Sequence, residues 1–166
     1  RGENTVRASG KYELPADGTG WATQPLAADF QISVPRLGDF LIAGGSSKIG
    51  GTFHAGGTVS SGADGLQGRM DATGRALEFQ GLHVRTLDAN LTLREKLLTL
   101  SRLALVLDDQ NHVHGEGSVH LDGNMAYRGV FNVDLQDLSQ FQSLVGDKDI
   151  AGALKISWSG TGAVQD

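Results

Sequence analysis

The sequence predicts a mostly β protein, a curved antiparallel sheet that forms an open groove, with one or two short helices at its edge or end. Along much of the chain apolar residues alternate with polar ones, which is the period of a strand with one buried face. Clusters of Gly, Asp and Asn separate these segments, as hairpin turns require. Only two segments place apolar residues three or four positions apart, the spacing of a helix face.

The first alternating segment covers residues 26–34. Its apolar positions are Leu26, Ala28, Phe30, Ile32 and Val34, with Asp29, Gln31 and Ser33 between them. A short amphipathic helix is predicted next, over 35–42, because a proline suits the first helical turn and Pro35 precedes Leu37, Phe40 and Leu41.

Three further strands are predicted in the middle of the chain. Alternation continues at Leu103, Leu105 and Leu107; at Val113, Val119 and Leu121; and at Tyr127, Phe131, Val133 and Leu135. The polar run 94–96 lies between two leucine-rich stretches and predicts a hairpin turn. The run 122–124, Asp-Gly-Asn, suits another tight hairpin.

The last elements are a second short helix over 137–144 and a final strand. Asp137 is positioned to cap this helix. Alternation then resumes at Ile150, Leu154, Ile156 and Trp158.

An internal repeat connects the two ends of the chain. A shift of 101 residues places Phe30 on Phe131, Leu37 on Leu138 and Gly51 on Gly152, so that 26–59 corresponds to 127–160. Both copies have the order strand, short helix, glycine, strand. We therefore expect residues 1–166 to be a single β-groove segment excised from a longer repetitive protein.

Composition excludes several classes of protein. The net charge is −5 with no basic cluster, which disfavours nucleic acid as a partner. With no cysteine, neither a disulfide nor a thiolate metal site can form. The longest apolar run, 103–107, is far shorter than the ~18 residues of a membrane span.

The apolar positions of the predicted strands are the candidate site, a lining for lipid acyl chains. An acyl chain gains about 0.8 kcal/mol for each methylene removed from water and requires no hydrogen-bonding partner. We expect no cofactor and no metal. The candidate groove residues are Phe30, Ile32, Val34, Phe53, Leu103, Leu105, Leu107, Phe131, Val133, Leu135, Leu154, Ile156 and Trp158.

The succession of motifs in the second half resembles the AsmA-like superfamily, and within it the TamB type, the translocation and assembly module proteins of Gram-negative envelopes. The similarity covers most of residues 20–164. It is carried by the runs 113–119, 127–131, 150–154 and 158–162, together with Asp137-Leu138.

The resemblance implies a long sheet folded lengthwise like a taco shell, with an apolar concave face and a polar convex face. It implies a periplasmic bridge that carries phospholipid between the inner and outer membranes, or supports outer-membrane protein assembly with a β-barrel partner. It also implies an inner-membrane anchor, which we expect to lie outside this segment.

Two other interpretations have some support in the sequence. His112, His114 and His120 share one strand parity with Glu116, as a metal site would need, although a solvated strand face explains them equally. A carbohydrate-binding β-sandwich would use Trp21, Tyr127 and Trp158 as a stacking platform, but the last two fall on the apolar parity.

An enzyme has the least support. Gly-x-Ser-x-Gly is absent, and the neighbouring carboxylates Asp108 and Asp109 lie in a predicted turn. We therefore expect a protein without catalytic activity.

Overall fold

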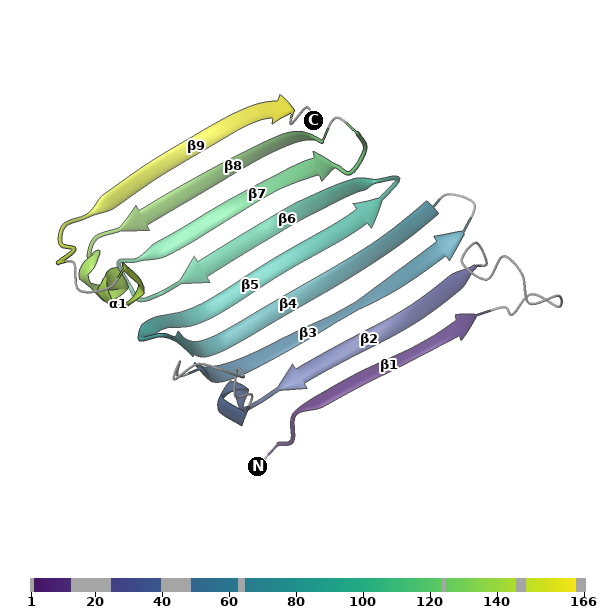
Figure 1. Cartoon of the computed structure of the whole chain (residues 1–166), viewed down its shortest axis with the longest axis horizontal. Coiled ribbons are helices and arrows are strands. Elements are labelled where there is room, and N and C mark those ends of the chain that lie inside the picture. Colours follow the sequence, from purple (N-terminus) through teal and green to yellow (C-terminus); the bar gives the residue numbers. More distant parts are fainter. Residues whose placement is uncertain are drawn as a thin grey trace.

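The described residues form one open antiparallel sheet, as the alternation predicts (Figure 1). A computed structural model describes residues 2–12, 25–39, 49–62, 65–123, 125–145 and 149–163. Its strands are β1 Thr5–Tyr12, β2 Leu26–Val34, β3 Ile49–Gly62, β4 Gly65–Phe79, β5 Leu82–Arg94, β6 Leu97–Val106, β7 His112–His120, β8 Ala126–Leu135 and β9 Leu154–Ala163.

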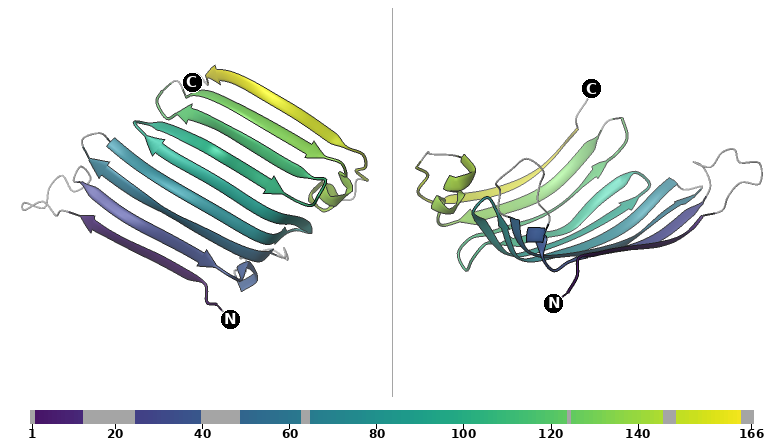
Figure 2. Two further views of the ribbon diagram at one scale, coloured as in Figure 1. Left: turned by 180° about the vertical axis from the view of Figure 1, so that it is seen from behind. Right: turned by 60° about the horizontal axis from the view of Figure 1, so that its bottom comes forward.

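The strands follow the chain as a meander. Each one pairs antiparallel with the next, from β1 at one edge to β9 at the other. The sheet is a single curved layer with its helical turns at one end, and no second sheet among the described residues packs against it (Figure 2). The polypeptide therefore has two broad faces rather than an enclosed interior.

The helical turns are shorter than predicted. Within 35–42 the structure shows the 3₁₀ turn η2, Leu37–Asp39. Residues 35 and 36 are not helical, and residues 40–42 lie outside the described residues. The second helix consists of η3, Ser139–Phe141, followed by α1, Gln142–Val145. The Asp137 carboxylate accepts a hydrogen bond from the Ser139 N–H at 2.9 Å, but it is not the cap that the sequence suggested, because the N-cap position of η3 is Leu138, which makes no side-chain cap hydrogen bond.

The predicted hairpin at 94–96 is present as a two-residue turn between β5 and β6. Glu95 and Lys96 have φ of 48° and 64°, and both residues of a type I′ turn need such left-handed values. Gln80 and Gly81 form a similar turn between β4 and β5, with φ of 51° and 86°.

Irregularities interrupt the ladder at two places, between Gly50 and Thr52 of β3 and at Ser101 of β6. Asn90 of β5 pairs with Arg102, but the next residue, Leu91, pairs with Leu100, so Ser101 is an extra residue in β6. A bulge shifts the alternation of a strand by one position and bends the strand. This is why Leu98 and Leu100 share a face with Leu103 and Leu105, although the two pairs differ in sequence parity.

Three sequence expectations were wrong at strand ends. Leu107 lies beyond the end of β6, Leu121 lies beyond β7, and β9 begins at Leu154 rather than at Ile150. Residues 5–12 and 65–79 form strands that the alternation did not predict, because their apolar-side positions are largely Gly and Ala.

The core is thin, as a single-layer sheet requires. No large side chain among the described residues is fully buried. The buried apolar residues are Val34, Ala55, Ala72, Ala89, Ala104, Leu107 and Leu135.

Candidate functional site

One face of the sheet is apolar from edge to edge. Directly paired residues of neighbouring strands point to the same face, so the register assembles transverse rows of side chains. One row crosses all nine strands. From β1 to β9 it consists of Val6, Ile32, Ala55, Ala72, Ala89, Leu103, Gly115, Phe131 and Trp158.

Three neighbouring rows have the same character. The second is Ala8, Phe30, Gly57, Met70, Leu91, Leu100, Gly117, Gly129 and Gly160. The third is Gly10, Ala28, Val59, Gly68, Leu93, Leu98, Val119, Tyr127 and Gly162. The fourth, from β2 to β9, is Val34, Phe53, Gly74, Leu87, Leu105, Val113, Val133 and Ile156. These four rows define what we call the apolar face, whose polar side-chain groups are the Tyr127 hydroxyl and the Trp158 indole N–H.

The structure brings the candidate groove residues together on this side of the sheet. Ten of them lie in the four rows: Phe30, Ile32, Val34, Phe53, Leu103, Leu105, Phe131, Val133, Ile156 and Trp158. Leu135 and Leu154 pair with each other one step beyond the fourth row. Leu107 follows β6 and is buried.

Sequence reasoning missed the middle of the apolar face. Ala55, Ala72 and Ala89 are buried there, and Met70 and Leu91 lie in the next row. A search for alternating residues that counted Gly and Ala as apolar would have found these positions.

Aromatic rings on the apolar face lie flat over glycines. A Cβ on Gly129 would meet Phe131 Cε2 at 3.0 Å and Trp158 Cζ3 at 3.1 Å, and one on Gly160 would meet Trp158 Cζ2 at 2.9 Å. The Phe131 and Trp158 rings are 5.9 Å apart and tilted by 38°. Glycine therefore lets large rings cover backbone and keeps the face smooth.

The opposite face, which we call the polar face, carries hydroxyl, amide and charged groups. One of its rows, from β1 to β9, is Ser9, Asp29, Thr58, Arg69, Thr92, Thr99, Ser118, Arg128 and Thr161. Two-faced strands of this kind are expected when only one side of a sheet is removed from water.

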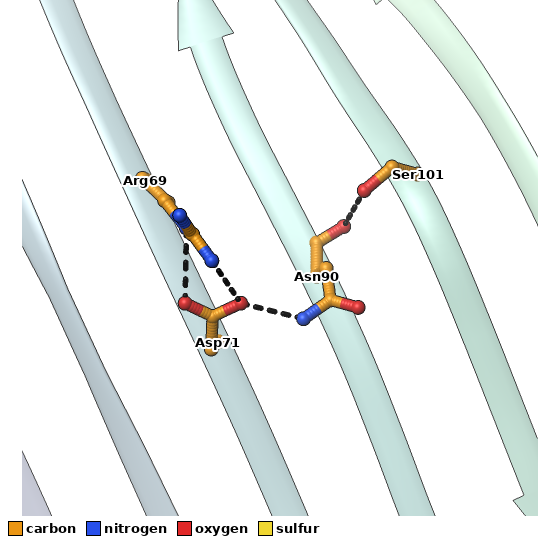
Figure 3. A network of polar contacts seen from close by, with 4 residues as sticks. All are labelled: Arg69, Asp71, Asn90 and Ser101. Carbon is orange, nitrogen blue, oxygen red and sulfur yellow. Dashed lines mark hydrogen bonds and ion pairs between the residues drawn. The ribbon is translucent and has the colours of Figure 1, made fainter.

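A polar network connects the central strands on the polar face (Figure 3). The Arg69 guanidinium donates to both Asp71 carboxylate oxygens, at 3.0 and 3.3 Å, and the Asn90 amide donates to Asp71 at 2.5 Å. These hydrogen bonds, from Arg69 first, lower the pKa of Asp71. The network connects β4 to β5 and stabilises their register.

Shallow hollows lie on both faces. One of about 660 Å³ lies over β6–β9 and is lined on the polar face by Thr99, Glu116, Ser118, Arg128, Ser159 and Thr161. Another, of about 240 Å³, lies on the apolar face among Phe30, Val59, Met70, Leu91, Leu93 and Leu98. Of these two hollows, the one on the apolar face is the smaller.

The three candidate histidines lie on the polar face. The rings of His112 and His114 are 5.3 Å apart, and His120 lies at the far end of β7. Within the described ranges, no group of three His, Cys, Asp or Glu side chains is arranged to hold a metal ion.

The proposed sugar-stacking platform is not assembled by the described residues. Trp21 lies outside them. Tyr127 and Trp158 are both on the apolar face, in rows separated by the Gly129–Gly160 pair.

Comparison with family models, curated proteins and solved structures returned no match. Among the helical turns that the structure describes, none has the length and apolar character needed to cross a membrane.

Proposed function

We propose that this chain binds lipid acyl chains on its apolar face. The observation that carries the proposal is the set of four apolar rows, which cross the sheet without a charged side chain and which no described strand covers. Several large apolar groups there stay accessible, including Trp158 at 40% and Ile156 at 44% exposure. An uncovered apolar surface of this extent is typical of a site for an apolar partner.

The dimensions of the face suit an acyl chain. Strands lie about 4.8 Å apart, so eight intervals across the nine-stranded sheet span roughly 38 Å. The hydrocarbon of one membrane leaflet is only about 15 Å thick, half of a bilayer core of ~30 Å. A whole acyl chain therefore fits along the rows, and each buried methylene contributes about 0.8 kcal/mol.

The resemblance to the AsmA-like superfamily supplies the wider setting of the proposal. In that setting the segment belongs to a periplasmic bridge, anchored in the inner membrane, that carries phospholipid to the outer membrane. Support for outer-membrane protein assembly with a β-barrel partner would use the same surface, because nascent barrel strands also present apolar side chains.

A charge placed on the apolar face tests the proposal. The variants Ile156→Asp and Leu105→Asp should lose most of the phospholipid that copurifies with the protein, measured by native mass spectrometry and by photo-crosslinking to a lipid probe. Burying a carboxylate against hydrocarbon without a partner is strongly unfavourable.

The matched control is Ser157→Asp, which places the same charge on the polar face one residue away from Ile156. It should retain lipid at the level of the unsubstituted protein. Equal lipid capture by the Ile156→Asp and Ser157→Asp proteins, both folded by circular dichroism, would contradict the assignment of the ligand to the apolar face.

A further inference from the structure

Two parts of the sheet repeat one unit of strand, strand, helical turn, strand. The first is β1, β2, η2 and β3, and the second is β7, β8, η3 with α1, and β9. The same side-chain hydrogen bond occurs in both. Asn4, just before β1, accepts from the Arg36 N–H at 3.2 Å, and Asn111, just before β7, accepts from the Asp137 N–H at 3.2 Å.

Backbone geometry gives the same correspondence. Arg36 and Asp137 are 101 residues apart in the sequence, and so are Gly51 and Gly152, whose φ values are 100° and 106°. Such left-handed values are favoured only for glycine. Gly51 lies at the irregularity near the start of β3, and Gly152 lies two residues before β9, so the two glycines mark corresponding bends. β9 is therefore the structural counterpart of β3.

The two counterparts differ in what lies at their outer edges. β3 pairs with β4 from Ile49 to Gly62, whereas the outer edge of β9 has no partner among the described residues. Figure 1 shows β9 at the margin of the sheet. The strand is weakly protected, because its one charged residue is Lys155, at its start, which forms an ion pair with Asp134 at 3.0 Å. Edge strands that avoid pairing usually carry several charges or a proline.

The edge formed by β1 is different. β1 is the counterpart of β7 and carries two cationic residues, Arg7 and Lys11, in eight positions. A strand added at β1 would have to pack beside both of them. The asymmetry favours β9 as the edge that accepts a strand.

We propose that the outer edge of β9 accepts one further strand, antiparallel, an extended segment with the alternation of apolar and polar residues found in β4. Transferring the β3–β4 register by 101 residues pairs Trp158 with the position of Met70, Ile156 with that of Ala72, and Ser157 with that of Asp71. The added strand extends both faces of the sheet by one row, and its main-chain hydrogen bonds supply the affinity. This binding needs no lipid and is independent of the function proposed above.

A synthetic peptide with the β4 sequence, residues 65–79, tests the site on the intact protein. We expect saturable binding by fluorescence anisotropy and hydrogen-exchange protection of the β9 amides. A peptide of the same composition with its alternation shifted by one residue should bind about tenfold more weakly, because a one-residue slip turns every apolar side chain to the wrong face. Absence of protection in β9, or equal binding of the shifted peptide, would overturn the proposal.

The register is tested by a charge pair. Ser157→Asp should weaken binding of the β4 peptide about two- to fivefold, since like charges directly opposite on a sheet repel. A peptide carrying Asp71→Lys should restore or exceed the original affinity for that variant. Identical affinities across this cycle would show that the peptide does not occupy the β4 register at β9.

Discussion

Glycines beneath aromatic rings set the character of the apolar face at the scale of single residues. Phe131 and Trp158 lie over Gly129, and Trp158 also lies over Gly160. Rings that lie flat cover the backbone and expose less of their own surface to water than rings that stand upright. The same absence of side chains made these positions invisible to a search for hydrophobic alternation.

Gly129→Ala should destabilise the sheet by about 1–3 kcal/mol, because the new methyl group would meet both rings and the Glu116 carbonyl at 3.2 Å or less. Tryptophan fluorescence should shift to longer wavelength as the Trp158 ring is displaced toward water. Gly123→Ala is the control, because a Cβ there meets nothing within 4 Å. Equal urea midpoints for the two variants would refute the packing argument.

Asn111 is the one buried polar residue among those described, with 3% of its surface exposed. Its side-chain oxygen accepts from the Gln136 N–H at 2.7 Å and the Asp137 N–H at 3.2 Å, and its amide donates to Asp108 at 2.6 Å. It thereby connects the β6–β7 loop to the segment that follows β8.

Asn111→Ala should cost about 2–3 kcal/mol of unfolding free energy, because two backbone N–H groups lose their acceptor in a buried setting. Asn4→Ala removes the corresponding bond to Arg36 at an exposed site and should cost less than about 1 kcal/mol. Chemical denaturation of both variants measures the difference. A larger loss for Asn4→Ala would contradict the role assigned to burial.

At the scale of elements, turns and bulges decide which residues of each strand lie on the apolar face. The sequence predicted the turn at Glu95 and Lys96 from its polar character, and the structure confirms it. The bulge at Ser101 was not predicted, because a serine in a leucine-rich strand carries no mark of an extra residue. Without that bulge Leu98 and Leu100 would face the opposite side from Leu103 and Leu105.

Replacing the turn residues by Glu95→Asn together with Lys96→Gly should stabilise the protein by about 1 kcal/mol. Both native residues adopt left-handed φ values, which cost L-residues roughly this amount and which Asn-Gly tolerates. The Lys96 carbonyl, which accepts from the Leu121 N–H at 2.7 Å, is retained in the variant. A melting temperature at or below that of the unsubstituted protein would be the contrary result.

At the scale of the whole molecule, carboxylates on strands and loops make stability depend on pH. The pKa values of Asp71, Asp108, Asp134 and Asp137 are all lowered, chiefly by hydrogen bonds from Arg69, Gln110, Lys155 and Ser139 respectively. A carboxyl with a lower pKa in the folded state stabilises the fold above its unfolded value and loses this contribution as pH falls through the folded value.

The protein should therefore be stable at neutral pH and lose stability as pH falls below about 3.8, the ordinary value of these groups. Asp108→Asn keeps an acceptor oxygen for the Gln110 and Asn111 backbone N–H groups and loses the acceptor of the Asn111 side-chain amide. Because it does not titrate, it should show a smaller loss of stability on acidification. Urea unfolding between about pH 2.5 and pH 6 measures the two slopes. Parallel slopes would exclude a contribution of Asp108 to the pH dependence of the unfolding free energy.

The sequence by itself determined that the strands are two-faced and antiparallel, and which residues of β2, β6, β8 and β9 point to the apolar side. Alternation is local information, carried by each strand independently of its neighbours. Most of the candidate groove residues were identifiable for that reason.

Only the tertiary structure decided how those strands combine. Ala55, Ala72 and Ala89 form one row because three strands align in register, and Phe131 lies between Gly115 and Trp158 because β8 pairs with both β7 and β9. Cross-strand pairing depends on turn geometry and bulges as well as on side-chain pattern. The same pairing leaves the outer edge of β9 open among the described residues, a property that no single strand sequence contains.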